Sequence, residues 1–297
     1  CQRTSATLIC VAILSLAGAC GISPTDNQED LLPALVAHNA AERAKITSYV
    51  VELELESKVH TLPLGLTPAP DPTPGASPPG IKVFVSAKLY RKGQWLAVEK
   101  HTRTEGMERG GMNRTWIAVL NDEYSAFSMR PGHIEQHFHA SIAEMSTREQ
   151  DLSSVILDLD PLKLSYDCVA ITLGGVIENA NQFKDEGHRL EVHEQNVAGG
   201  AAYLLQHFMP SMFGGEKPDT EYLIEPGRGF IVTRIRAYDN DGSVRIRRDV
   251  EAQQLKAGIW FPRIIVDNWR GAQDTTITIK SAEVNGAVPD ETFQLAG

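Results

Sequence analysis

Three histidines lie close together in one stretch of the sequence, where residue types and spacing first suggest chemistry. They are His133, His137 and His139. A helix would place His133 and His137 on one face and a strand would pair His137 with His139, so no regular element presents all three together. A protein zinc site would also need a fourth ligand, such as Glu135 or a distant residue. We therefore favour polar positions on a strand and predict no metal site.

Two pairs of acidic residues are the next candidates, because neighbouring carboxylates can act as acid and base. Asp158 and Asp160 precede Pro161, whereas Asp239 and Asp241 lie in a predicted hairpin turn. Aspartate is common at such turns and helix ends, where its side chain binds the backbone. The sequence also lacks GxSxG, a P-loop, HExxH and a GxGxxG that follows a strand. We therefore predict that the protein is not an enzyme and needs no cofactor.

Arginines are concentrated in one predicted hairpin. They are Arg234, Arg236, Arg245, Arg247 and Arg248. Arginines that face each other on neighbouring strands repel unless acids lie between them. Candidate acids are Asp249, Glu251, Glu221 and Glu225. We interpret this as a solvated outer sheet face, and the alternative is a docking surface for anionic headgroups or a partner.

Composition excludes some partners. The net charge of −10 argues against nucleic acid, which requires a basic surface. An aromatic content of 7% does not favour a surface for stacking sugars or bases. A chain of 297 residues with 42% hydrophobic content can bury a sizeable core, and we expect one domain and a monomer.

The amino terminus is typical of a targeting segment. Leu8–Leu16 is apolar but too short to span a bilayer, so residues 1–19 are predicted to be a signal peptide. Small residues before Cys20 resemble a bacterial lipobox, which would make Cys20 a lipidated first residue followed by a tether over residues 20–28. Ala17 and Ala19 also fit cleavage by ordinary signal peptidase. We expect a protein of the bacterial envelope, on the periplasmic side, anchored to a membrane by this lipid.

Cys168 has two interpretations. With Cys20 lipidated, Cys168 is alone and is expected to be a small buried apolar residue. With Cys20 unmodified, a disulfide between the two is the alternative.

The remaining chain, residues 29–297, is predicted to be one mainly antiparallel β domain with a few helices. A helix is expected over Glu29–Ile46 and a strand over Ser48–Val59, where apolar residues alternate with glutamates. Residues 62–80 are rich in proline and predict an exposed loop between two strands. Helical spacing marks Arg148–Leu159, and Pro161–Ala180 fits either a helix or a broken strand. Further strands are expected over Ile81–Tyr90, Trp95–Thr104, Thr115–Leu120, Glu123–Met129, Arg189–Val192, Ala201–Met209 and Thr275–Val284.

The segment Thr220–Trp269 predicts an antiparallel meander. Its three extended runs are Phe230–Tyr238, Ser243–Val250 and Ile259–Trp269, and Asp241-Gly242 between the first two is a strong hairpin signal. Within the first run, apolar and arginine side chains alternate, as in a half-buried strand.

The landmarks from Thr220 to the end resemble one known family. They comprise a turn at Pro226-Gly227, the Tyr238-Asp239 strand end, the Gly258-Ile-Trp-Phe-Pro-Arg263 segment, Val284-Asn285, and Pro289-Asp-x-x-Phe293-x-Leu295. This pattern is similar to the bacterial outer-membrane lipoprotein-sorting superfamily, the LolA/LolB-like proteins. The predicted helix and the strand that follows it resemble the start of that family.

The resemblance implies an unclosed β-barrel, or strongly curved antiparallel sheet, wrapped around helices. It also implies an apolar cavity for lipid acyl chains or a lipidated polypeptide, which needs no catalytic group. Residues expected to line it are Val51, Leu53, Leu55, Trp95, Ile235, Ile264 and Val266. The alternative is a structural or protein-interaction module of the envelope with a filled core and an Arg-rich sheet face.

One stretch departs from the family. In its soluble carrier, an arginine on an early strand helps to hold a helical lid shut. The corresponding stretch here, Gln94–Val98, contains no arginine, and the basic residues that follow it are Lys100 and Arg103. This difference favours a membrane-tethered relative over a soluble shuttle.

Overall fold

The computed structural model describes residues 28–60, 80–106, 113–122, 125–131, 159–168, 171–198, 200–210 and 216–294. Several predictions therefore lie outside the described residues. They are the signal peptide, the tether with Cys20, the proline-rich loop, the histidines at 133, 137 and 139, and almost all of the helix expected before Leu159.

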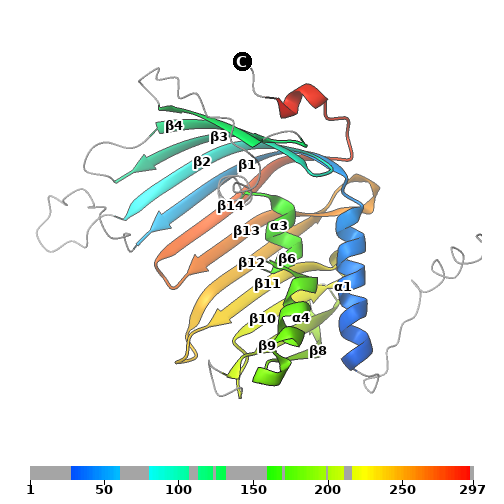
Figure 1. The fold of residues 1–297 in the computed structure, drawn as a ribbon. Helices are drawn as coiled ribbons and strands as arrows, with labels where there is room; N and C mark the ends of the chain where they lie inside the picture. The colour runs from blue at the N-terminus through cyan, green and yellow to red at the C-terminus, as the bar shows by residue number, and fades with distance from the viewer. Residues whose placement is uncertain are drawn as a thin grey trace, which may run out of the picture.

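Twelve antiparallel strands of the described chain form one sheet, in the order β5-β4-β3-β2-β1-β14-β13-β12-β11-β10-β9-β8 (Figure 1). Each half of this order is a meander of consecutive strands, and the halves meet where β1 pairs with β14. The bounds are β1 Ser48–Val59, β2 Ile81–Lys92, β3 Trp95–Glu105, β4 Asn113–Leu120, β5 Ser125–Pro131, β8 Arg189–Val197, β9 Gly200–Phe208, β10 Thr220–Glu225, β11 Ile231–Tyr238, β12 Val244–Gln254, β13 Trp260–Trp269 and β14 Gln273–Val284.

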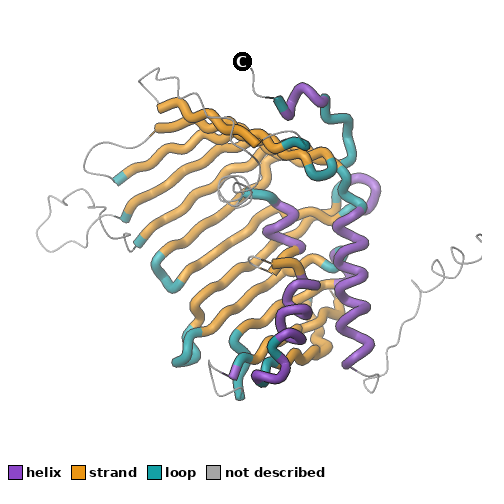
Figure 2. The backbone as a smooth tube through the Cα atoms, viewed as in Figure 1, coloured by secondary structure: helices purple, strands orange, loops and turns teal. Residues whose placement is uncertain are grey.

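The sheet is strongly curved, and the helices lie on its concave side (Figures 1 and 2). They are α1 (Gln28–Ala44), α3 (Pro161–Tyr166) and α4 (Leu173–Gln182), with a small hairpin of β6 (Asp167–Cys168) and β7 (Ile171–Thr172) between α3 and α4. Within the described part of the chain, the edge strands β5 and β8 do not pair with each other, so the sheet is open. The predicted fold class, an unclosed curved sheet around a few helices, is confirmed. Among these helices, none is long and apolar enough to cross a membrane.

Strict alternation in the sequence sets the two faces of the sheet. In β1, Val51 and Leu53 are buried on the concave face, whereas Glu52, Glu54 and Glu56 are exposed on the convex face. Alternate side chains of a strand point to opposite faces, so this segment fits only one register. The structure gives β1 the predicted bounds.

The ambiguous segment Pro161–Ala180 contains two short helices rather than one element. Thr172 caps α4, and its Oγ1 accepts a hydrogen bond from the Gly175 backbone N–H at 3.1 Å. Gly174 and Gly175 thus lie in the first turn of α4 instead of interrupting a helix. An added Cβ at Gly174 would lie 3.4 Å from the Val36 side chain, so this glycine allows α1 and α4 to approach closely.

A strained turn just before β11 contacts α1 and so holds this helix against the sheet. Gly229 and Phe230 have φ angles of 68° and 56°, an uncommon conformation for phenylalanine. The Phe230 carbonyl accepts a hydrogen bond from Asn39 Nδ2 at 2.8 Å, and its ring stacks on His38 at 4.8 Å between centroids. The α1 contacts therefore stabilise the strained backbone.

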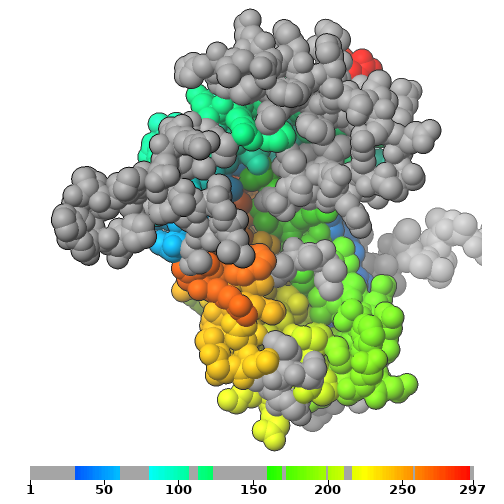
Figure 3. Space-filling view, turned by 60° about the vertical axis from the view of Figure 1, so that its left-hand side comes forward, coloured from blue at the N-terminus to red at the C-terminus, as the bar shows by residue number. Residues whose placement is uncertain are grey.

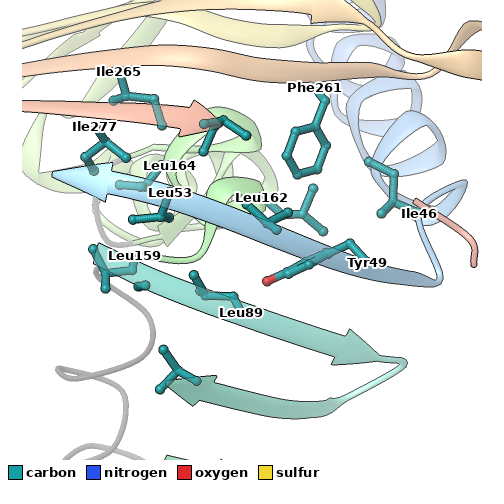
Figure 4. Close-up of a cluster of buried hydrophobic side chains, with 14 of the residues drawn as sticks. Ile46, Tyr49, Leu53, Leu89, Leu159, Leu162, Leu164, Phe261, Ile265 and Ile277 are labelled. Atoms are coloured by element: carbon teal, nitrogen blue, oxygen red, sulfur yellow. The ribbon is translucent and has the colours of Figure 1, made fainter. Parts of the chain in front are cut away.

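Two apolar clusters form most of the core. In the first, Leu159, Leu162 and Leu164 around α3 pack on β1, β2, β13 and β14 (Figure 4). In the second, α1, α4 and Cys168 pack on β8 to β11. Cys168 is a free cysteine, 2% exposed, and burial raises the pKa of its thiol. This confirms its predicted role as a small buried apolar residue.

Candidate functional site

One buried carboxylate fixes α3 on the concave face. Asp160 is 0% exposed and caps the helix by accepting a hydrogen bond from the Leu162 N–H at 2.9 Å. It also accepts hydrogen bonds from Tyr49 Oη at 3.0 Å and from Arg91 Nη1 at 3.0 Å. Burial, followed by the charge of Asp160, raises the pKa of Tyr49 well above its usual value, so the phenol remains a donor. Strands β1 and β2 thus hold the start of α3.

Arg91 supplies a contact that sequence reasoning missed. Gln94–Val98 lacks arginine, but Arg91 lies just before it and faces inward at the end of β2. Alternate residues from Ile81 to Leu89 face the concave side, and continuing this pattern by two residues places Arg91 there as well. This alternation is the sequence signal that could have revealed the contact. An arginine of an early strand therefore contacts the residue that caps α3, although it lies outside Gln94–Val98.

Further polar contacts join α1, α3 and the sheet. Arg43 Nη1 and Asp167 Oδ1 are 2.7 Å apart. Burial raises the pKa of Asp167, and the charge of Arg43 opposes this shift. Tyr166 Oη donates to the Trp260 carbonyl at 3.1 Å. These bonds join the helices into one layer over the middle of the sheet.

Beyond this helical layer, apolar side chains continue along the concave face toward the hairpin ends. Leu55 and Val83 are only partly buried against the first cluster, and Ile246 is half-buried. Trp269 is 57% exposed at the end of β13. Figure 3 shows a hollow bordered by the strands coloured teal and orange, with green side chains at its base. This open apolar surface is the candidate binding site.

Four residues expected to line the cavity lie on the concave face. Val51, Leu53 and Ile235 are buried beneath the helices, with exposures of 0%, 2% and 0%. Leu55 is at the margin of the helical layer and is partly buried. Only Leu55 is therefore placed where a ligand could reach it without displacing α3. A role in ligand contact remains a prediction for all four.

Three residues of that set are on the other face. Ile264 and Val266 pair with Thr278 and Thr276 on the convex side, and Val266 is 39% exposed. Because the apolar run in β13 is continuous, the sequence did not reveal which of its alternate residues face inward. In the structure Ile265 faces inward. Trp95 also points outward, where its ring meets Phe293 edge-on at 5.7 Å. The prediction that these three line a cavity is wrong.

Part of the positive charge of the arginine-rich hairpin is balanced by Asp249. Arg236 and Arg247 face each other, as expected for some registers, and both bind Asp249, at 2.8 and 2.6 Å. Arg248 does not belong to this outer face, because it lies opposite Ile235 on the concave side. The convex face is therefore less basic than the sequence indicated.

Two open depressions lie on the convex face, with volumes of about 580 Å³ and 300 Å³. Both linings contain charged residues, among them Glu54 and Arg103 in the larger depression and Lys88 and Lys280 in the smaller. Such a lining does not suit an acyl chain, since apolar burial would require these charges to lose water.

Two histidines, the buried His207 and the half-buried His188, pack together at the β8 end of the second meander. His207 Nδ1 lies 3.4 Å from Asp219 Oδ1, and its ring centroid is 5.3 Å from that of His188. His188 in turn packs on Phe183, the residue that ends α4. Within the described residues, no group of three His, Cys, Asp or Glu side chains is arranged to hold a metal. The pair therefore serves to dock α4 on the sheet.

Comparisons with known proteins add structural similarities. A DUF1329 family protein from Desulfovibrio piger is 11% identical, with a TM-score of 0.43, over 89% of this chain and 97% of that chain. A LolA superfamily protein from Nitrosomonas europaea is 8% identical, with a TM-score of 0.39, over the same shares. No family model matches the sequence, and no curated protein matches it. The second structure belongs to the superfamily that the sequence landmarks resemble.

Proposed function

We propose that this protein binds a lipid acyl chain, carried by a lipid or a lipidated polypeptide, on the concave face of its sheet. The observation that carries the proposal is the apolar surface that continues past α3, where Leu55, Val83 and Ile246 are incompletely covered by the described helices. Apolar surface removed from water by a ligand contributes about 25 cal/mol per Å². Such binding needs no catalytic group.

The proposed setting is the periplasmic side of a bacterial envelope. It rests on the apolar segment before Cys20 and on the small residues that precede this cysteine. Lipidation at Cys20 would tether the domain to a membrane through residues 20–28. Mass spectrometry of the protein from its native envelope tests this part, since a lipidated Cys20 gives a defined mass increase and an unmodified one does not.

The binding test is co-purification of lipid followed by native mass spectrometry, together with displacement of a fluorescent fatty acid. We expect lipid-sized adducts that are lost on delipidation and a probe that competes with them. A Leu55→Glu variant places a charge on the open apolar surface and should weaken probe binding. Glu54→Gln, one residue away on the convex face, is the matched control and should bind normally.

The absence of both lipid adducts and probe binding would contradict the proposal. It would favour the alternative, a structural or interaction module of the envelope. For that role the convex face offers an arginine cluster in which Arg236 and Arg247 share the carboxylate of Asp249.

A further inference from the structure

A row of polar side chains crosses the concave face between two apolar rows. Strand pairing places Arg248, Asp267, Thr275 and Ser57 side by side on β12, β13, β14 and β1. We call these four residues the polar belt. A continuous polar row inside an otherwise apolar surface calls for a physical explanation, because buried polar groups are costly unless they are bonded.

The rows on either side of the polar belt are apolar and differ in exposure. Toward α3 lies the inner row, whose members pack in the first cluster: Val250, Ile265, Ile277 and Leu55. Toward the hairpin ends, Ile246 pairs with the exposed Trp269. Successive rows are two residues apart, or roughly 7 Å. The concave face is thus apolar within and polar at the belt, and its rim row carries Ile246, Trp269 and Val59 with Gln273 among them.

Most hydrogen-bonding groups of the polar belt are already satisfied. Ser57 Oγ and Thr275 Oγ1 are 2.9 Å apart, and Gln273 Nε2 donates to both, at 2.9 and 3.1 Å. Arg248 donates to both carboxylate oxygens of Asp267, from Nε at 2.7 Å and from Nη2 at 2.8 Å. Arg248 Nη1 is buried without a partner, and the Arg248 side chain is only 10% exposed. One donor of the polar belt is therefore free.

We propose that Arg248 Nη1 donates a hydrogen bond to the ester or amide carbonyl of a neutral acyl ligand whose chain lies over the incompletely covered residues Leu55 and Val83. This inference rests on the proposed function and names the chemical group that the site prefers. The charge of Arg248 is already balanced by Asp267, so a neutral acceptor completes the site without adding charge. A free carboxylate would lie close to the Asp267 carboxylate in a partly buried place, where like charges repel.

The test compares three ligands that share one alkyl chain. Monolauroylglycerol carries the ester carbonyl, monododecylglycerol ether lacks it, and laurate carries a carboxylate. Each displaces a fluorescent lipid probe from the purified protein below its micelle concentration. We expect the ester to bind about tenfold more tightly than the ether, the ratio for one hydrogen bond of ordinary strength, and more tightly than laurate.

The variant that tests the donor removes both charges together, because a lone buried charge would destabilise the fold. The double substitution Arg248→Met with Asp267→Leu should bind the ether as before and lose the preference for the ester. Arg247→Met, on the convex side of the same strand, is the matched control and should keep that preference.

Equal binding of ester and ether by the unaltered protein overturns the inference while leaving the proposed function intact. The same holds if the double variant keeps the preference. If none of the three ligands binds, the proposed function itself fails, and the inference with it. The comparison of ligands on the unaltered protein decides the matter even where the double variant does not fold.

Discussion

Asp160 is the residue on which the position of α3 depends most. Its carboxylate accepts hydrogen bonds from the helix itself, from Tyr49 on β1 and from Arg91 on β2. Full burial makes each of these bonds costly to break, since water cannot replace the lost partner. A single side chain thus couples the helical layer to the middle of the sheet.

Replacing this carboxylate should strongly destabilise the protein. Asp160→Ala leaves Arg91 partly buried without its partner, for which we expect a loss of about 3 to 5 kcal/mol in the free energy of unfolding. Tyr49→Phe removes one hydrogen bond and should cost about 1 to 2 kcal/mol. Urea denaturation measures both values. Asp290→Ala, which removes an exposed pair with Lys92, is the control, and a similar loss there would contradict this account.

His207 should make stability depend on pH. Burial lowers its pKa and the nearby His188 adds to this shift, whereas Asp219 opposes it. The unfolded chain therefore takes up the proton before the folded one does. Stability is fully present above the unfolded pKa of about 6.5 and is lost as pH falls from there toward the lower folded pKa.

Urea denaturation at roughly pH 7.5 and 5.5 tests this sign. His207→Asn should flatten the loss of stability between these two conditions. His101→Asn alters an exposed histidine on the convex face and should leave the pH dependence unchanged. If the His207→Asn variant loses as much stability between these two pH values as the unaltered protein, groups other than His207 cause the loss.

At the scale of elements, the end of the chain covers an apolar patch on the convex face. Val288 and Phe293 pack on Ala97 and Val119, with Trp95 beside them. The Phe293 carbonyl accepts a hydrogen bond from Asn121 Nδ2 at 2.9 Å. This tail therefore acts as a cover for β3 and β4 rather than as a loose end.

Phe293→Ala should uncover this patch and cost about 3 kcal/mol, as for other large buried aromatic residues. The fluorescence of Trp95 should also move to longer wavelength as water reaches its ring. Val266→Ala trims an exposed side chain of the same face and should change stability by less than about 0.5 kcal/mol. If the tail contributes little to stability, the Phe293→Ala and Val266→Ala variants will show the same small change in the free energy of unfolding.

Elements with strict alternation were predictable from the sequence, and short or continuously apolar ones were not. The strand Ser48–Val59 shows its buried face in every second residue. In β13 the apolar residues are consecutive, so the sequence could not distinguish Ile265 from Ile264 and Val266. Helix α3 spans only Pro161–Tyr166, too short for a periodic signal.

The sites depended on tertiary pairing and were harder to predict. Arg248 follows Arg247 in the sequence and was assigned to the same outer face, although neighbouring residues of a strand point to opposite faces. Its contact with Asp267 depends on the register between β12 and β13, which the sequence alone does not specify. The hydrogen bond between Tyr49 and Asp160 likewise joins residues that are distant in the sequence.

At the scale of the molecule, the open sheet presents its concave face along a rim formed by hairpin ends. Trp269 is exposed on this rim beside Ile246, next to the polar belt. A ligand bound at the polar belt lies beside the strand end that carries Trp269. The indole ring is therefore placed to report on binding at this end of the concave face.

Binding of monolauroylglycerol should shift tryptophan emission to shorter wavelength, because the ligand removes water from the Trp269 ring. Trp269→Phe should lose most of this change. Trp95→Phe, which alters a ring on the convex face, should retain it. An emission change that survives the first substitution and disappears with the second would place the ligand on the wrong side of the sheet.

The pairing of β1 with β14 has a consequence for how the chain reaches its fold. These two strands occupy the centre of the sheet but come from opposite ends of the described sequence. Each meander can form from local hairpins, whereas the junction between them requires closure of a very long loop, which slows folding. During synthesis, the β1 edge stays unpaired until the last strand has been made. We therefore expect the middle of the sheet to assemble last and to be the part most open to aggregation in that interval.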